Sequence, residues 1–269
     1  MDILNKIIAQ KRIELSQYMQ VVSLDQLRTM FLNCRTAQHS LKNALSQSAT
    51  PVIAEFKRKS PSKGFINESA DVKDIIPGYA RSGAAGISVL TDRQFFGGNI
   101  GDLKLARTLT DLPLLRKDFI IDEYQLYVAK AIGADVILLI AAALTVEQTL
   151  RLARKAKTLN LEVLLELHDE KELGHINEYV DIVGINNRNL KTFSVDIDAS
   201  IRLADRLPAD LMRISESGIS QPETIVHLMD AGFRGFLIGE CFMKAPDPEA
   251  ELNDFILRVE ELRKTNNRI

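Results

Sequence analysis

Eight short apolar runs recur at intervals of about 20–30 residues beyond residue 50, and this repetition constrains the fold more than any other feature. Segments with the spacing of amphipathic helices, such as 146–160 and 221–232, separate the runs. The runs span residues 52–57, 86–91, 113–117, 135–140, 162–167, 182–187, 211–217 and 235–240. Near-continuous apolar strands that alternate with helices are typical of a parallel sheet covered on both faces.

The number of strand–helix units distinguishes two parallel architectures. Eight units predict a closed (β/α)8 TIM barrel, because a doubly wound sheet typically has about five to seven strands. A chain of 269 residues, 46% of them apolar, is long enough to bury one such core. We therefore place a single catalytic barrel at residues 51–269.

Residues 1–50 are expected to form an N-terminal helical extension packed on the barrel. Apolar residues at helical spacing over 3–20, and Ser23 as a possible N-cap of a second helix, support this interpretation. The extension covers either the amino-terminal face of the barrel or its active mouth, and the pattern leaves both alternatives open.

Composition excludes several classes of function. The formal net charge is −2 and the charges of both signs are interspersed, which argues against nucleic acid as a partner. With no run of about 18 uncharged apolar residues and no signal-peptide pattern, we expect a cytoplasmic protein without a membrane span. Two cysteines and four scattered histidines predict neither a disulfide framework nor a metal site. No apolar stripe requires association, so we expect a monomer, or at most a weak homodimer.

Charged and amide side chains stand at the carboxyl ends of the predicted strands, where such barrels carry their chemistry. They are Glu55, Lys57, Lys117, Glu166, Asn186 and Glu216, with Arg188 just beyond the sixth strand. Taken singly, each charge is as well explained by a structural ion pair. Three carboxylates and two lysines gathered at one end of a barrel would instead shift each other's pKa values and suit acid–base catalysis.

The first strand shows how charges reach the barrel interior. Side chains alternate along a strand, so Glu55 and Lys57 share one face and Phe56 takes the other. If Phe56 packs outward under the helices, the two charged groups point into the barrel. The loop that follows, 58–63, is expected to be a mobile basic rim whose first two cations are solvated.

Two glycine-containing turns predict a phosphate site. Ser217–Gly218 follows the seventh strand and Gly239–Glu240 the eighth, and a short helix N-terminus would add further N–H donors. Either glycine alone is ordinary turn chemistry. A carboxylate would repel a phosphate, so we expect the Glu240 N–H to point inward and its side chain to point away.

Two aromatic residues follow the second and third strands. Phe96 and Phe119 could both face the mouth, although core packing is the default for phenylalanine. Above a charged floor, the two rings would form a slot for a flat aromatic ligand.

The motifs at 3–15, 53–64, 114–125, 164–172, 184–190, 214–219 and 237–248 resemble those of the indole-3-glycerol-phosphate synthases of tryptophan biosynthesis. They follow the family's order, cover essentially the whole chain, and resemble its monofunctional form. The family converts 1-(2-carboxyphenylamino)-1-deoxyribulose 5-phosphate into indole-3-glycerol phosphate, with loss of CO2 and water. The resemblance therefore implies a small phosphorylated substrate and no cofactor, because the substrate accepts its own electrons.

The resemblance also implies roles for single residues. Lys117 matches the general acid, while Glu55, Lys57 and Glu166 match further acid–base groups whose division of labour stays open. The remaining matches are Asn186 and Glu216 for orientation; Arg188 and Lys57 for anionic groups of the substrate; Ser217, Gly218, Gly239 and Glu240 for phosphate, with Ser60 as a helper; and Phe96, Phe119, Leu138 and Leu190 for the aromatic ring. The extension becomes a partial cover of the active mouth.

Two other classes remain as alternatives. One is a different phosphate-binding barrel enzyme, either a sugar-phosphate isomerase or an aldolase that forms a Schiff base through a neutral lysine such as Lys117. The other is a non-catalytic phosphate-binding barrel that serves as a partner subunit, which would be expected to lack part of the acid–base set.

Overall fold

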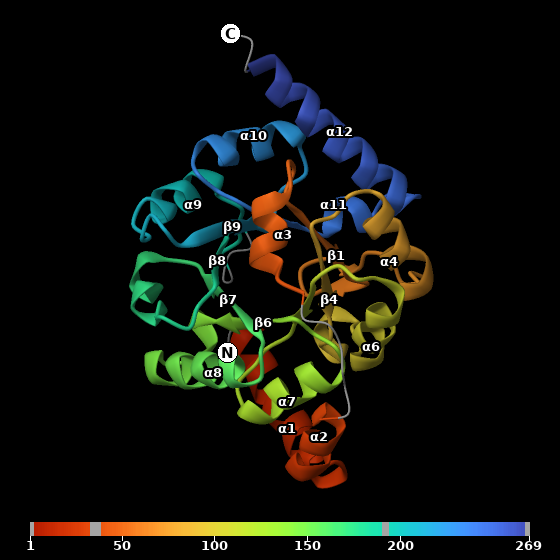
Figure 1. The fold of residues 1–269 in the computed structure, drawn as a ribbon, viewed down its shortest axis with the longest axis vertical. Helices are drawn as coiled ribbons and strands as arrows, with labels where there is room; N and C mark the ends of the chain where they lie inside the picture. Colours follow the sequence, from red (N-terminus) through yellow and green to blue (C-terminus); the bar gives the residue numbers. More distant parts are fainter. Residues whose placement is uncertain (1–2, 33–38, 190–193, 267–269) are drawn as a thin grey trace.

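The computed structural model describes residues 3–32, 39–189 and 194–266, and within these ranges eight parallel strands close into a barrel (Figure 1). The strands are β1 (Val52–Phe56), β4 (Gly86–Leu90), β5 (Leu114–Lys117), β6 (Val136–Ile140), β7 (Glu162–Leu167), β8 (Ile182–Asn186), β9 (Met212–Glu216) and β10 (Phe236–Ile238). Neighbours follow chain order, and β1 pairs with β10 to close the ring. The predicted (β/α)8 fold with an N-terminal helical extension is confirmed.

Helices cover the outside of the barrel (Figure 1). The longer ones are α4 (Val72–Arg81), α6 (Ile100–Leu109), α7 (Glu123–Ala131), α8 (Val146–Thr158), α9 (Ile197–Ala204), α10 (Pro222–Asp230) and α12 (Pro248–Asn266). Short turns of helix follow several strands: α5 (Arg93–Phe96), η1 (Ala141–Ala143), η2 (Glu170–His175) and α11 (Glu240–Met243). None of these described helices combines the length and the apolar character needed to span a membrane.

The strands separate two apolar layers because side chains alternate between their faces. Phe56 of β1 is buried in the outer layer, under helices, with Tyr79 of α4. Ile53 of the same strand lies in the inner layer with Leu138 and Leu164. The alternation predicted for β1 therefore holds, and it turns Glu55 and Lys57 toward the barrel interior, where both line a cavity.

The third helix of the extension closes the amino-terminal end of the barrel. Figure 1 shows α3 (Leu41–Gln47) lying across the ring of strands. Its Leu41 and Leu45 are buried among the inward-facing residues of the barrel. The carboxylate of Glu162, at the start of β7, accepts hydrogen bonds from the Leu41 N–H at 2.8 Å and the Ser40 hydroxyl at 2.5 Å. This charge stabilises the N-terminus of the helix.

The first helix of the extension lies at the opposite end. Ile3, Leu4 and Ile7 of α1 (Ile3–Val21) line the cavity at the carboxyl ends of the strands. The second helix, α2 (Leu24–Leu32), directly follows Ser23, whose hydroxyl accepts from the Gln26 N–H at 3.2 Å as predicted for an N-cap. The extension therefore covers both ends of the barrel. α3 covers the amino-terminal face and α1 covers the mouth at the carboxyl ends, so both predicted alternatives are partly correct.

The loop after β1 is more structured than the sequence suggests. It contains a small hairpin, β2 (Lys59–Ser60) with β3 (Gly64–Phe65). The guanidinium of Arg58 lies 2.5 Å from Asp102 of α6 and donates to the carbonyl of Ala70 at 2.9 Å. The expectation that Arg58 is solvated was wrong, because this half-buried ion pair ties the start of the loop to the barrel.

Candidate active site

A cavity of about 610 Å³ opens at the carboxyl ends of the strands. The predicted polar strand-end residues line it together with the α1 cover. The structure brings the following predicted site residues to this cavity: Glu55, Lys57, Ser60, Phe96, Lys117, Phe119, Leu138, Glu166, Asn186, Arg188, Glu216, Ser217, Gly218, Gly239 and Glu240. Leu190, the remaining one, lies outside the described residues.

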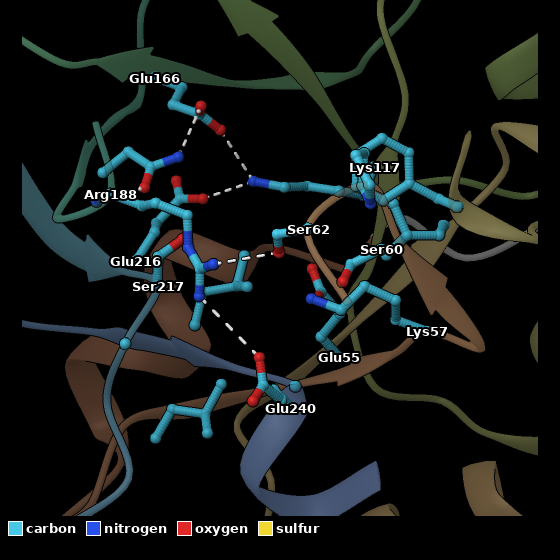
Figure 2. Close-up of a pocket in the computed structure, with 18 of the residues that line it drawn as sticks. Glu55, Lys57, Ser60, Ser62, Lys117, Glu166, Arg188, Glu216, Ser217 and Glu240 are labelled. Atoms are coloured by element: carbon cyan, nitrogen blue, oxygen red, sulfur yellow. Dashed lines mark hydrogen bonds and ion pairs between the residues drawn. The ribbon is translucent and has the colours of Figure 1, made fainter. Parts of the chain in front are cut away.

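Lys117 is the centre of the charged floor. Figure 2 shows its amine reaching between two carboxylates, and the Lys117 Nζ lies 2.9 Å from Glu166 Oε2 and also forms an ion pair with Glu216. Burial alone would lower the pKa of Lys117, but Glu166, Glu216 and Glu55 outweigh it and hold the pKa above its usual value. Lys117 is therefore a fixed ammonium group, able to protonate a strongly basic oxygen.

The two carboxylates beside Lys117 have different environments. Glu166 also accepts a hydrogen bond from Asn186 Nδ2 at 3.0 Å. Although burial opposes it, the attraction of Lys117 holds the pKa of Glu166 well below its usual range. Glu216 is more deeply buried, and one of its oxygens has no hydrogen-bond partner among the described residues. Burial and the nearby charges of Glu166 and Glu55 raise the pKa of Glu216. One carboxyl therefore stays ionised while the other holds a proton more readily.

Glu55 and Lys57 form a further ion pair on the same floor. The Lys57 Nζ lies 2.5 Å from Glu55 Oε1, and Glu55 is only 3% exposed. Glu55 belongs to β1 and Lys57 directly follows it, two residues on, so the extended backbone directs both side chains to the same side. Ser60 is buried beside them, and its hydroxyl has no hydrogen-bond partner within the described ranges. The cavity floor thus contains one lysine between two carboxylates and one lysine–glutamate pair.

Aromatic and aliphatic side chains form an apolar wall above these charges. The ring centroids of Phe96 and Phe119 lie 5.8 Å apart with their planes tilted by 37°, and both residues line the cavity. Leu138 of β6 is fully buried at the same cavity. The structure thus brings these three side chains to one cavity, and their role as a slot for a flat ring stays a prediction.

The two predicted phosphate turns lie together at another part of the cavity. Ser217 and Gly218 both have positive φ angles, 71° and 72°. A β-carbon at Gly218 would lie 2.4 Å from Val195 Cγ1, so this position requires glycine for both its conformation and its space. β9 and β10 are neighbouring strands, so the Ser217–Gly218 turn and Gly239 follow adjacent strands at the same cavity.

The side chain of Glu240 does not point away, and this expectation was wrong. Glu240 Oε1 lies 2.5 Å from Lys63 Nζ and forms an ion pair with Lys244, while Oε2 lies 3.9 Å from a nitrogen of Arg188 (Figure 2). The three cations attract the carboxylate toward the cavity. The expectation considered only repulsion between the carboxylate and a phosphate, and it left out this attraction.

The described part of the chain contains no cluster of metal-binding side chains. No group of three or more histidine, cysteine, aspartate or glutamate side chains there is arranged to hold a metal ion. The carboxylates of the cavity are engaged by lysine and amide groups instead.

Comparison with known proteins identifies the family. The family model described as indole-3-glycerol phosphate synthase matches residues 4–255. The chain belongs to this family. A relative of that name from Bacteroides thetaiotaomicron is 52% identical over 259 residues, covering 96% of this chain and 99% of the relative. Another indole-3-glycerol phosphate synthase, from Polaromonas naphthalenivorans, is 44% identical over 255 residues, covering 93% and 97%.

Solved structures with little sequence identity share the barrel. Tryptophan synthase subunit alpha from Legionella pneumophila superposes with a TM-score of 0.61 at 12% identity, covering 84% of this chain and all of that chain. Thiamine phosphate pyrophosphorylase from Pyrococcus furiosus gives 0.59 at 16% identity, covering 82% and 98%. At these identities the similarity shows the fold alone.

One ionisable residue beside the charged floor of the cavity, His168, was not predicted from the sequence as part of the site. His168 follows β7, and its Nε2 lies at ion-pair distance, 3.2 Å, from Glu166 Oε1, with Nδ1 3.7 Å from Glu172 Oε2. Although burial opposes it, these two carboxylates raise the pKa of His168 to about 10. The signal was present, because His168 stands two residues after Glu166, the same spacing that joins Glu55 to Lys57.

The charge on His168 predicts a pH-dependent stability. Its folded pKa lies above its unfolded value of about 6.5, so its stabilising effect is complete below pH 6.5 and is lost as the pH rises toward 10. Between pH 7 and 9 we expect the unfolding free energy of the wild type to fall, relative to His168→Asn, by at most about 1.4 kcal/mol per pH unit. Urea unfolding at pH 7, 8 and 9 measures this difference.

His175 provides the control for this prediction. It is a buried histidine that contacts the Thr149 hydroxyl at 2.8 Å, and its pKa is lowered by burial. His175→Asn should therefore keep the wild-type decline in stability between pH 7 and 9. Equal pH profiles for His168→Asn and the wild type would show that His168 is neutral.

Proposed function

We propose that the protein is an indole-3-glycerol-phosphate synthase, a carbon–carbon lyase of tryptophan biosynthesis. It would close the ring of 1-(2-carboxyphenylamino)-1-deoxyribulose 5-phosphate with loss of CO2 and water. Membership of the family supports the proposal. Among the structural observations, the ammonium of Lys117 held between Glu166 and Glu216 carries it furthest, because this reaction needs a proton donor at a developing alkoxide.

The first step joins the aromatic ring to the sugar carbon. The ring carbon that bears the carboxylate attacks the ketone, and the carbonyl electron pair becomes an alkoxide. Lys117 donates a proton to this oxygen, and Glu166 and Glu216 hold the amine at the point of transfer. The apolar wall of Phe96 and Phe119 would hold the ring in line with the ketone.

The second step breaks the bond to the carboxylate. Attack leaves an iminium next to the tetrahedral ring carbon, so CO2 departs and its bonding electrons neutralise the iminium. The ring regains its aromaticity and no oxidant or reductant takes part. A flat apolar slot favours this step, because a carboxylate loses its charge as it becomes CO2.

The third step removes water. The new hydroxyl leaves with a proton, and a neighbouring ring carbon loses a proton to complete the indole. We assign protonation of the hydroxyl to Lys57 and removal of the carbon-bound proton to Glu55, because the two groups form a preassembled acid–base pair. Lys57 contacts Glu55, whereas Lys117 contacts Glu166 and Glu216, so ring closure and dehydration would use different proton donors.

The rival aldolase chemistry requires a different state of Lys117. A Schiff base forms only with a neutral amine, whose pKa must be depressed. Two carboxylates instead hold the pKa of Lys117 above its usual value. The geometry therefore favours proton donation over nucleophilic attack.

The test supplies the purified protein with the carboxyphenylamino sugar phosphate and follows indole fluorescence. The proposal predicts product formation and no lysine adduct after borohydride treatment. A trapped adduct at Lys117 without indole product would establish aldolase chemistry instead. Binding without any turnover would support a non-catalytic phosphate-binding barrel.

Gly239 offers a test of the Glu55 assignment. A β-carbon at this position would lie 2.6 Å from Glu55 Oε1 and 2.9 Å from Glu55 Cβ, so Gly239→Ala must displace the Glu55 side chain. A displacement of about 1 Å at a catalytic group can cost about 100-fold, and we expect a fall in kcat of this order. Gly174→Ala is the matched control, because its nearest neighbour is an ordinary contact at 3.9 Å. Equal kcat values for the two variants would remove Glu55 from the chemical steps.

A further inference from the structure

Three cations from three separate parts of the chain surround the carboxylate of Glu240. Lys63 comes from the hairpin after β1, Arg188 follows β8, and Lys244 follows α11. Figure 2 shows Arg188 between Ser62 and Glu240, and the Arg188 Nη1 donates to the Ser62 hydroxyl at 3.2 Å. The carboxylate is therefore the common anionic partner of a cationic cluster at the cavity wall.

The location of this cluster is chemically unexpected. Glu240 adjoins Gly239, and both line the cavity with the Ser217–Gly218 turn that we assign to phosphate. Lysine and arginine bind phosphate and carboxylate through the same charge-assisted hydrogen bonds. A phosphate that enters this region therefore meets cations already neutralised by Glu240, as well as the negative charge of the carboxylate itself.

The ion pairs between Glu240 and its two lysines can open readily, so that the lysines can bind another anion. The side chains of Lys63 and Lys244 are 47% and 49% exposed, so water replaces their partners at little cost. Lys117 and its carboxylates, by contrast, are buried and fixed. Although partial burial opposes it, Lys244 and Lys63 lower the pKa of Glu240 to about 2. The carboxylate consequently remains charged across the physiological range of pH.

We propose that Glu240 is an internal competitor for the phosphate group: it holds Lys63, Lys244 and Arg188 in the ligand-free protein and releases them to the phosphate of substrate or product. The inference rests on the proposed function only in taking the ligand to be a phosphate ester. Because substrate and product carry the same phosphate, Glu240 weakens both complexes. Its effect is to limit product retention at the expense of substrate affinity.

The experiment measures binding of inorganic phosphate, without substrate, by isothermal titration at constant ionic strength. Glu240→Gln keeps the size of the side chain and removes its charge. We expect this variant to bind phosphate at least about five-fold more tightly than the wild type, and with a steeper loss of affinity as salt is added. Glu261→Gln, an exposed change on α12 with the same effect on net charge, should leave the affinity unchanged.

A double variant tests whether the increase in phosphate affinity of Glu240→Gln comes from the released cations. Adding Lys63→Met to Glu240→Gln should remove much of the increase in affinity, because the phosphate then loses one of the released cations. Unchanged or weaker phosphate binding by Glu240→Gln would overturn the inference, since Glu240 would then be neutral or would organise the cations for the ligand. The outcome is independent of turnover: if the protein formed no indole product, the phosphate result would still stand or fall by itself.

Discussion

Replacing Lys117 by methionine is expected to lower kcat by about 1,000-fold or more, the largest loss of activity predicted here. Acid–base groups contribute about 100- to 10,000-fold, and Lys117 is the cation that both Glu166 and Glu216 hold at the cavity floor. The substrate should still bind with a KM near that of the wild type, because the proposed ring slot and the proposed phosphate turns are left intact. Steady-state kinetics with indole fluorescence measure both constants.

A second lysine separates this effect from the loss of any buried lysine. Lys130 is also buried, lies on α7 and does not line the cavity. Lys130→Met should keep kcat within a few-fold of the wild type. In Lys117→Met the two carboxylates lose their main counter-charge, so their pKa values should rise and the pH–rate profile should move to higher pH. An unchanged kcat in Lys117→Met would remove the residue from the acid role.

Replacing Lys11 by methionine should give the largest loss of stability. Lys11 is 5% exposed, and its Nζ lies 2.9 Å from Asp92 and 3.0 Å from Asp118. Removing one partner from a buried ionic group leaves uncompensated charge and typically costs about 3–5 kcal/mol. Lys11 also attaches the α1 cover to the loops after β4 and β5, so we expect KM to rise as well. Urea unfolding and steady-state kinetics test the two effects.

Lys6 on the same helix provides the matched control. It is exposed, so Lys6→Met should change the unfolding free energy by about 0.5 kcal/mol or less. If Lys11→Met were as stable as Lys6→Met, the buried ionic group would contribute nothing to folding. If it were less stable but had an unchanged KM, α1 would not depend on Lys11 for its place over the mouth.

The sequence predicted the barrel and most of the cavity for one physical reason. Alternation along a strand fixes the face of each side chain, and parallel strands deliver their carboxyl ends to one opening. Glu55 and Lys57 could thus be placed together from their two-residue spacing. Lys117, Glu166 and Glu216 come from three strands, and closure of the barrel brings them into contact.

Other features depend on contacts that periodicity does not encode. Helical spacing in the extension indicates an apolar face but not the end of the barrel against which it packs, so α1 and α3 could not be placed. Lys11 did carry a signal, because it lies on the helix face defined by Ile7 and Leu15. The direction of the Glu240 side chain carried only a partial signal, the spacing of four residues to Lys244 on the following turn. Its other two cations, Lys63 and Arg188, are distant in the sequence.

In the proposed reaction, ring closure is coupled to loss of the substrate carboxylate at this cavity. The most direct test is a single turnover of substrate labelled with 13C in its carboxyl group, with labelled CO2 and indole-3-glycerol phosphate measured together. We expect one labelled CO2 for each indole formed by the wild type, and neither product at a comparable rate from Lys117→Met. An indole product that retained the label, or CO2 released without indole, would contradict this expectation.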